Sequence, residues 1–300
     1  MTLYSDGWWQ SEDGLNLHYR DYAGADAVVR PPILCLPALT RNARDFATLA
    51  EQLSAPDGNG WRVICPEMRG RGHSQYAPDP TTYTPLHYVQ DVLRLLDHLA
   101  LERVVLIGTS LGGLMTIAMS MIAPQRIAGA LFNDIGPVLE AGGLAKIGTY
   151  LGTDPRFESW EEATAHQKAL FGEAFPARSD ADWMAGARRT MIEAADGSVC
   201  FDYDPAIAAP FKVPGGAAPL PDLWPGFEAL AGIPVLLVRG ALSDLLSAET
   251  FAEMARRLPD ALAITVADVG HPPSLDEPEA VAAIPHWLGQ IAALHPGGQT

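Results

Sequence analysis

One serine stands in a sequence pattern that is typical of nucleophilic catalysis. Ser110 is the centre of Gly108-Thr109-Ser110-Leu111-Gly112, a G-x-S-x-G pentad between the apolar run 104–107 and a stretch with helical periodicity. The two glycines leave room for a strained strand-to-helix turn that lifts the serine above a sheet and faces it with a helix N-terminus. The competing interpretation is a flexible turn with an inert serine. The context favours a nucleophile at Ser110.

A serine hydroxyl needs a base within hydrogen-bond reach and an anion that orients the base. Of eight histidines, His271 lies in a loop between the last strand-like run and the C-terminal helix, where a base would hang over the strand ends. His73, the other loop histidine, is expected to stabilise a turn, and His18 is placed on an edge strand. The sequence therefore predicts His271 as the general base, with a plain surface loop residue as the alternative.

Two aspartates are candidates for the acid that orients His271. Asp244 follows an apolar run, Pro234 to Val238, and gives the chain order Ser110, Asp244, His271. That order is typical of G-x-S-x-G enzymes. Asp134, after an earlier strand-like run, can also reach a histidine and is the second candidate, whereas Asp268 is expected to be solvated. The sequence predicts a triad of Ser110, Asp244 and His271.

The elements that position these residues alternate between strands and helices. Runs without polar alternation predict strands that are buried on both faces; they lie at 33–36, 63–65, 104–107, 127–132 and 234–238. Asn42, Thr84 and Ser247 are expected to cap helices between them, and a hairpin is expected in the first 20 residues. This alternation predicts an α/β fold with a mostly parallel sheet that is flanked by helices.

The segment 137–226 interrupts the pattern. It contains helix-like patches, many Pro and Gly residues and an excess of aromatics, and no buried-strand run. We interpret it as a helical lid (cap) inserted into a core made of 1–136 and 227–300. Trp160, Trp183 and Phe211 are the candidates for contact with substrate, although aromatics of this kind can equally serve only to hold an insertion together.

Composition excludes several classes of protein. Of 300 residues, 48% are hydrophobic and 19% charged, which describes a globular chain and excludes disorder. The formal charge of −16 opposes binding to nucleic acid or to anionic membranes. No apolar run is long enough to span a bilayer, and the N-terminus shows no secretory signal. We therefore expect a cytoplasmic protein whose partner is a small molecule; the oligomeric state cannot be read from the chain.

Cysteine usage points away from a disulfide framework or a metal site. Cys35, Cys65 and Cys200 are too few for a framework, and two of them end apolar runs. All three are expected to be reduced packing residues. We expect neither a metal nor a cofactor.

From about Leu15 to Leu294 the chain resembles α/β-hydrolase-fold proteins, in particular lidded serine esterases and meta-cleavage hydrolases. Besides the pentad, the segment 66–74 is similar to the D-x-R-G-x-G-x-S loop of such proteins, with Glu67 in place of the aspartate. The resemblance implies an eight-stranded sheet. It also implies an oxyanion hole formed by the backbone N–H groups of Leu39 and Leu111, although 36–40 reads Leu-Pro-Ala-Leu-Thr where many members have His-Gly. Pro285 is a further departure and is expected to break the C-terminal helix at Ile284.

These features predict a serine hydrolase that cleaves an ester or lactone of a small, largely apolar molecule through an acyl-enzyme on Ser110. Arg188 and Arg189 can recognise a carboxylate, but adjacent arginines are more often solvated. The alternatives that the resemblance leaves open are hydrolysis of a carbon–carbon bond in a vinylogous diketone and a non-catalytic small-molecule receptor. Dehalogenase and epoxide hydrolase chemistry uses an aspartate at the nucleophile position, so Ser110 argues against both.

Overall fold

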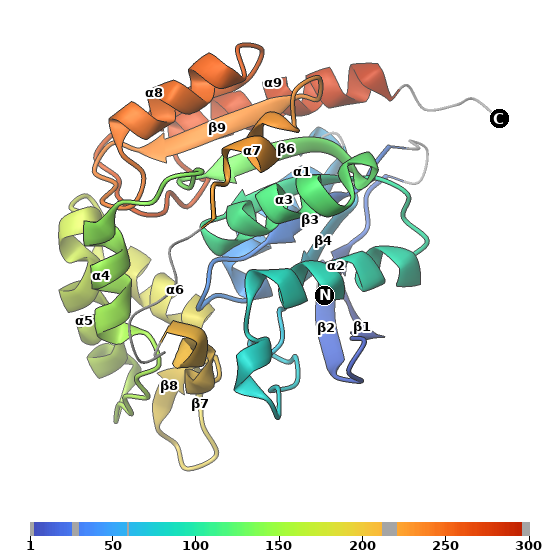
Figure 1. Cartoon of the computed structure of the whole chain (residues 1–300). Helices are drawn as coiled ribbons and strands as arrows, with labels where there is room; N and C mark the ends of the chain where they lie inside the picture. The colour runs from blue at the N-terminus through green and yellow to red at the C-terminus, as the bar shows by residue number, and fades with distance from the viewer. Residues whose placement is uncertain (1–2, 26–29, 59, 212–220, 296–300) are drawn as a thin grey trace.

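A sheet of eight strands forms the centre of the molecule. The computed structural model describes residues 3–25, 30–58, 60–211 and 221–295. The strand order is β1-β2-β4-β3-β5-β6-β9-β10 (Figure 1). Strand β2 pairs antiparallel with β1 and β4, and every other pair is parallel. The strands are β1 (Ser5–Gln10), β2 (Asn16–Tyr22), β3 (Ile33–Leu36), β4 (Val63–Pro66), β5 (Val104–Thr109), β6 (Ile127–Asn133), β9 (Val235–Gly240) and β10 (Leu262–Val266).

Helices connect the parallel strands. The α-helices are α1 (Ala47–Ser54), α2 (Pro85–His98), α3 (Leu111–Ile122), α4 (Ala141–Tyr150), α5 (Trp160–Phe171), α6 (Asp180–Thr190), α7 (Trp224–Glu228), α8 (Ala248–Arg257) and α9 (Pro278–Leu294). Short 3₁₀ helices are η1 (Ala43–Phe46), η2 (Pro56–Gly58), η3 (Pro80–Thr82), η4 (Pro124–Arg126), η5 (Gly172–Ala174) and η6 (Pro205–Phe211). The predicted α/β architecture with a mostly parallel sheet is confirmed.

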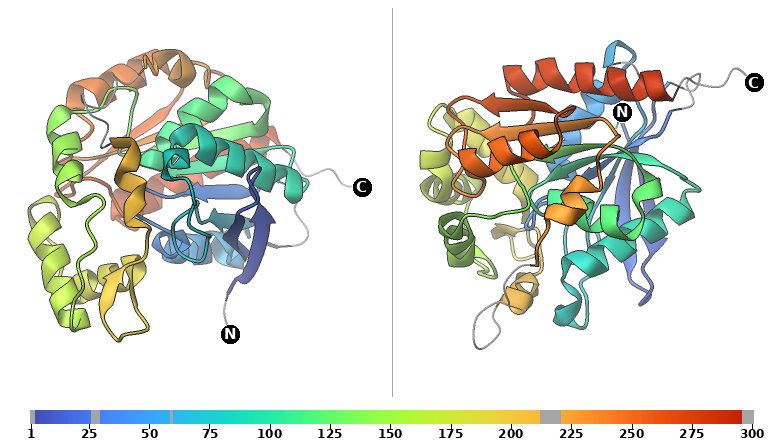
Figure 2. Two further views of the ribbon diagram at one scale, coloured as in Figure 1. Left: turned by 60° about the horizontal axis from the view of Figure 1, so that its bottom comes forward. Right: turned by 45° about the horizontal axis from the view of Figure 1, so that its top comes forward.

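Apolar side chains cover both faces of the sheet. Along β5, Val104 and Leu106 belong to a cluster that includes residues of α2, α3 and α8, whereas Val105 and Ile107 belong to a cluster with residues of α1 and α9. Figure 2 shows these helices on the two sides of the sheet. Successive side chains of a strand point to opposite faces, so a strand covered on both sides must be apolar throughout. This explains why β3, β4, β5 and β6 are fully buried.

The predicted helix caps are present. The side chain of Asn42 accepts a hydrogen bond from the N–H of Arg44 at the start of η1, which leads into α1. Thr84 caps α2 through the N–H of His87, and Ser247 caps α8 through the N–H of Thr250. Each cap gives a partner to an N–H group that the first helical turn leaves unpaired.

Two expectations about local structure are wrong. The C-terminal helix does not break at Ile284, because α9 continues through Pro285. Pro285 is exposed, so the carbonyl group that it deprives of a partner can bond to water, while Trp287, Leu288 and Ile291 keep the other face buried. His18 does not lie on an edge strand, since β2 is enclosed by β1 and β4.

The segment between β6 and β9 contains more than helices. Besides α4, α5, α6 and α7 it has β7 (Met191–Glu193) and β8 (Val199–Phe201), which form an antiparallel hairpin that the sequence did not indicate. Figure 1 shows α4, α5, α6 and the hairpin gathered on one side of the molecule, toward which the arrowheads of β6 and β9 point. Because catalytic groups of parallel sheets lie at the carboxyl ends of the strands, α4, α5, α6 and the hairpin, which together we call the inserted segment, are placed beside them (Figure 1).

A buried polar cluster connects β2 to the loop after β4. His18 Nδ1 lies 2.9 Å from Glu67 Oε2, and His18 Nε2 lies 2.8 Å from Asp6 Oδ1. The Glu67 carboxylate also accepts from the N–H of His73 at 2.6 Å. Burial disfavours the charged form of both side chains, but the hydrogen bonds between them prevail: the pKa of His18 is raised and that of Glu67 is lowered. Glu67 therefore has a structural role in the loop after β4.

We expect Glu67→Gln to lower the free energy of unfolding by about 3 kcal/mol, because it removes the buried one of the two carboxylates that pair with His18 and leaves only the exposed Asp6. The lowered pKa of Glu67 stabilises the folded state fully above pH 4.5, its value in the unfolded chain. This stabilisation is lost as the pH falls through the pKa of the folded state. The raised pKa of His18 stabilises the folded state fully below pH 6.5, its value in the unfolded chain. This stabilisation is lost as the pH rises through the pKa of the folded state. The difference between wild type and variant should therefore be largest between these two values. Chemical denaturation from pH 3 to 9 measures it, with the exposed Glu51→Gln as control; a difference that does not vary with pH would contradict the charged pair.

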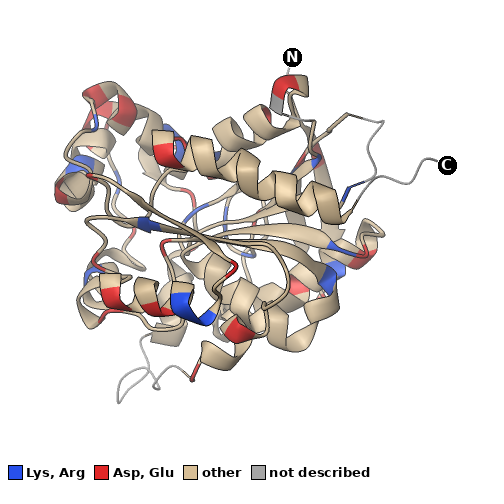
Figure 3. Cartoon of the chain, turned by 90° about the horizontal axis from the view of Figure 1, so that it is seen from above, with Lys and Arg blue, Asp and Glu red and all other residues tan. Residues whose placement is uncertain are grey.

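Acidic residues outnumber basic ones in the chain, 36 to 20, which gives the formal charge of −16. Figure 3 shows acidic segments on helices on both sides of the sheet. Within the described ranges, no helix combines the length and the apolar character that crossing a membrane requires.

Cys35, Cys65 and Cys200 are buried and unpaired, as expected for packing residues.

Candidate active site

Ser110 lies on a sharp turn between β5 and α3. Its φ is +51° and its ψ −114°, a conformation that residues other than glycine rarely adopt. The turn is tight because backbones approach closely: a Cβ at Gly108 would lie 2.6 Å from the carbonyl of Gly112, and a Cβ at Gly112 would overlap the carbonyl of Leu36. Both glycines of the pentad are therefore required by packing. The predicted strand-to-helix turn is confirmed, and it presents the Ser110 hydroxyl at the N-terminus of α3.

His271 lies beside this hydroxyl, although 161 residues separate the two in the chain. Its Nε2 is 2.9 Å from Ser110 Oγ. The histidine follows β10 and is held by neighbours on two elements: the N–H of Gly270 donates to the carbonyl of Ala174 at 2.6 Å, and Asn133 Nδ2 donates to the carbonyl of Pro273 at 2.9 Å. The structure thus brings together the predicted nucleophile and base.

The acid beside His271 is Asp134 and not Asp244. Asp134 Oδ2 is 2.8 Å from His271 Nδ1. Asp134 is fully buried, and its carboxylate also accepts from Ser243 Oγ at 2.6 Å and from the N–H of Gly240 at 2.9 Å. These donors fix the orientation of the carboxylate, which in turn orients the imidazole.

Asp244 points away from the triad. Its side chain is 41% exposed and pairs with Lys146 Nζ of α4 at 3.0 Å. Its neighbour Ser243 takes the position on Asp134 instead. The prediction of Asp244 was wrong because it relied on chain order, whereas spatial order decides: β6 lies between β5 and β9, so a residue at the end of β6 reaches the site directly. Asp268 is exposed, as expected.

The backbone N–H groups of Leu39 and Leu111 have no hydrogen-bond partner within the part of the chain that the structure describes. Leu111 is the first residue of α3, where unpaired N–H groups and the helix dipole favour negative charge. Leu39 lies in the loop after β3, and its carbonyl accepts from Arg71 Nε at 2.9 Å. Arg71 is fully buried and also donates to the carbonyl of Arg69, so it anchors this loop. Leu39 lines the cavity at Ser110, and Leu111 directly follows Ser110, which lines it too.

A cavity of about 50 Å³ lies above Ser110 and His271. Apolar and aromatic side chains line part of it, and polar ones the rest; they are Ile147, Tyr150, Phe171, Phe201 and Tyr203, and Arg41, Gln167 and Thr190. Its volume is below the roughly 300 to 1,000 Å³ of cavities that bury small-molecule ligands. A small-molecule substrate therefore needs more room at Ser110 than this cavity offers.

The three aromatics predicted to contact substrate do not line this cavity. Trp183 is fully buried against Phe175, and Trp160 packs in a small cluster of the inserted segment with Arg188 over its ring. Phe211 is 50% exposed at the end of η6. The prediction failed because it used aromatic character alone, which does not distinguish a side chain that packs the insertion from one that faces the site.

Sequence reasoning also missed Gln167 and Arg41. Gln167 is buried on α5, donates to Thr190 Oγ1 at 3.2 Å, and has an Oε1 without a partner among the described residues. It lies four residues after buried Ala163, so its inward position on the helix could have been read from the spacing. Arg41 carried no such signal, because it follows the strand in an irregular loop.

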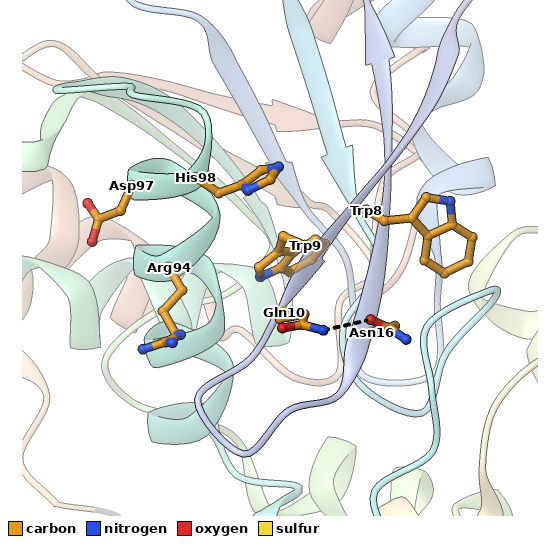
Figure 4. Close-up of a pocket in the computed structure, with 7 residues that line it drawn as sticks. All are labelled: Trp8, Trp9, Gln10, Asn16, Arg94, Asp97 and His98. Carbon is orange, nitrogen blue, oxygen red and sulfur yellow. Dashed lines mark hydrogen bonds between the residues drawn. The ribbon is translucent and has the colours of Figure 1, made fainter.

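A larger cavity of about 570 Å³ lies away from the triad, between β1, β2 and α2 (Figure 4). It is lined by Trp8, Trp9, Gln10, Asn16, Arg94, Asp97 and His98. None of these residues is a serine. Among the residues placed by the structure, no cluster of three or more His, Cys, Asp or Glu could hold a metal ion. The cavity at Ser110 is therefore the candidate active site.

A family model described as "Alpha/beta hydrolase family" matches residues 33–284, a range that contains the pentad, Asp134 and His271. The chain belongs to the alpha/beta hydrolase family. This alpha/beta hydrolase is similar to the 3-hydroxybutyrate-oligomer hydrolase of Cupriavidus necator, with 35% identity over 94% of this chain and 97% of that protein. It is also similar to the 2-(acetamidomethylene)succinate hydrolase of Mesorhizobium japonicum, with 26% identity over 80% of this chain and 81% of that protein.

A solved structure supports the same family. The crystal structure of an alpha/beta hydrolase from Novosphingobium aromaticivorans has a TM-score of 0.90 and 48% identity, covering 97% of this chain and 99% of that one. The fold that the resemblance implied, including the eight-stranded sheet, is confirmed.

Proposed function

We propose that this alpha/beta hydrolase cleaves carboxylic esters through an acyl-enzyme on Ser110. The observation that carries the proposal is one continuous hydrogen-bonded chain, in which Ser110 Oγ, His271 and Asp134 are joined at 2.9 and 2.8 Å. A serine in a strained turn, a base on it and a buried anion behind the base are the parts that acyl transfer requires.

The geometry supports the following steps. His271 Nε2 accepts the Ser110 proton as Oγ bonds to the ester carbonyl carbon, and Asp134 stabilises the imidazolium through Nδ1. The N–H groups of Leu39 and Leu111 donate to the oxyanion of the tetrahedral intermediate. The carbon–oxygen bond to the alcohol then breaks, and the alcohol leaves with the proton from His271. Water, deprotonated by the same histidine, releases the acid and restores Ser110.

The relative from Cupriavidus necator supports an ester substrate, because its name describes hydrolysis of 3-hydroxybutyrate oligomers, which are chains of esters. We propose short esters of hydroxy acids as the first substrates to test. Apolar side chains such as Tyr150 and Phe201 suit the carbon chain of such a molecule. Lactones, which carry the same functional group in a ring, belong to the same proposal.

An acyl-enzyme experiment tests the proposal. We expect wild type to hydrolyse 4-nitrophenyl butanoate and to carry one butanoyl group on Ser110 when turnover is quenched with acid, as measured by mass spectrometry of the intact protein and of its peptides. A fluorophosphonate should label the same serine with a stoichiometry of about one, because it traps the activated hydroxyl. Ester turnover without a modified Ser110 would contradict the mechanism.

The same assay separates the alternatives. Turnover of a vinylogous diketone with no turnover of any ester would support carbon–carbon bond hydrolysis. Binding of small molecules without turnover would support a receptor, against which the complete hydrogen-bonded triad argues.

A further inference from the structure

A second cavity, of about 70 Å³, adjoins the one at Ser110 and is unusually rich in arginine. Arg41, Gln167 and Pro272 line both cavities, so the two are neighbours. Arg178 and Arg189 of the inserted segment line the second one, together with the carboxylates of Asp45 and Asp276. Three guanidinium groups therefore face two carboxylates in a protein whose formal charge is −16. This local excess of positive charge is opposite to the charge of the whole chain.

Arg178 forms no close ion pair among the residues that the structure describes. Its guanidinium lies 3.7 Å from the centre of the Phe175 ring and donates to Ser274 Oγ at 2.9 Å. Within the described ranges, no carboxylate is close enough to form a salt bridge with it. Burial, followed by the repulsion of Arg41 and Arg189, lowers the pKa of Arg178 to about 10, and the attraction of Glu277 and Asp276 offsets only part of this effect. A cation in such a place is destabilised until an anion arrives.

The two neighbouring arginines are also only weakly neutralised. Arg41 lies 3.7 Å and Arg189 4.0 Å from the same oxygen of Asp45. Arg44 provides a contrast, because it pairs with Asp202 at 2.8 Å and donates to the carbonyl of Arg189. Arg44 has a structural role, whereas Arg41, Arg178 and Arg189 keep donors for a ligand.

The second cavity lies on the histidine side of the site. Pro272, Pro273 and Ser274, which directly follow His271, line it. In ester hydrolysis the alcohol leaves next to the histidine, because the imidazolium delivers its proton to the alcohol oxygen. The position of the second cavity next to the residues after His271 therefore favours the leaving alcohol over the acyl chain as the part of a substrate that reaches it.

We propose that Arg178, with Arg41 and Arg189, binds a carboxylate on the alcohol part of the substrate, so that the preferred substrates are esters of anionic hydroxy acids. The proposal rests on ester hydrolysis at Ser110. In the reaction, Ser110 Oγ bonds to the acyl carbon as the bond to the hydroxy-acid oxygen breaks, and the proton from His271 passes to that oxygen. The hydroxy acid leaves with its carboxylate still ionised.

Two substrates that differ only in charge test the proposal. The first is 3-(butanoyloxy)butanoate, and the second is its neutral amide, 3-(butanoyloxy)butanamide; release of butanoate is followed by chromatography. We expect wild type to prefer the carboxylate in kcat/KM by about 10-fold to 100-fold, which is the usual worth of hydrogen bonds to a charged group. Arg178→Gln should remove this preference, mainly by raising KM, and should leave the amide within about twofold.

Two further variants serve as controls. Arg178→Lys keeps the charge and should retain part of the preference, which a loss of structure would not allow. Arg188→Gln changes the neighbouring arginine of the same helix, whose guanidinium lies 4.4 Å over Trp160 and lines neither cavity. It should leave both substrates unaffected. Thermal unfolding of each variant shows whether the fold is intact.

Failure of this proposal can be distinguished from failure of ester hydrolysis. Equal turnover of the two substrates by wild type, or a preference that survives Arg178→Gln, would overturn the carboxylate site and leave the esterase intact. If no ester is hydrolysed, calorimetry measures the binding of both compounds to Ser110→Ala. Tighter binding of the carboxylate than of the amide, with the difference lost in the double variant Ser110→Ala/Arg178→Gln, supports the carboxylate site. Equal binding of the two compounds overturns it.

Discussion

Ser110→Ala is expected to lower kcat for ester hydrolysis by about 10⁶-fold, the size of loss that removal of a triad serine produces in serine hydrolases of another fold. The reason is that the imidazole of His271 and the donors at Leu39 and Leu111 then act only on water. Steady-state turnover of 4-nitrophenyl butanoate measures the effect. Substrate binding should persist, because the variant removes one oxygen and leaves the cavity walls in place.

The backbone at position 110 supplies an independent check. Its φ of +51° is strained for any residue with a Cβ, so Ser110→Gly should be as inactive as Ser110→Ala but more stable to heat. Ser198→Ala, which removes a serine from the turn of the β7–β8 hairpin, is the matched control and should keep full activity. Residual turnover above about 1% in Ser110→Ala would show that a different group is the nucleophile.

The parts of the fold that the sequence predicts are those governed by burial. Strands such as β3 and β5 are covered on both faces, and continuous apolar runs report this directly. Helix caps are local, so Thr84 and Ser247 could be recognised from their own neighbours. Ser110 was identified for the same reason: Gly108 and Gly112, which its strained turn requires, each lie two residues away in the chain.

The features that the sequence does not predict depend on contacts between distant segments. The β7–β8 hairpin has strands of three residues each, too short to show a periodic pattern. Pro285 continues a helix because packing on the opposite face outweighs the loss of one hydrogen bond. The cavity residues Arg41, Gln167 and Arg178 come from three separate elements, and only the fold places them side by side.

The acid of the triad shows the same limit most clearly. Both candidates follow strands, and chain order alone favours Asp244. The positions differ in space: Asp134 immediately follows β6 and is enclosed by Gly240, Ser243 and His271, whereas Asp244 lies further along its loop and reaches Lys146. A test that changes each aspartate in turn therefore also tests the placement.

Asp134→Asn is expected to lower kcat by about 10⁴-fold, whereas Asp244→Asn should leave it within about twofold. In Asp134→Asn the side-chain oxygen can still accept from the N–H of Gly240, but its amide then donates to His271 Nδ1. The imidazole must carry its proton on Nε2 and can no longer accept the proton of Ser110, so the loss arises from the wrong tautomer and not from a displaced histidine. Asp244→Asn breaks only an exposed pair with Lys146, which is worth little.

The kcat values of the two variants on 4-nitrophenyl butanoate, with thermal unfolding to confirm that each is folded, provide the measurement. Loss of activity in Asp244→Asn with activity retained in Asp134→Asn would reverse the assignment, because an aspartate that orients the base cannot be replaced by a group that donates to it.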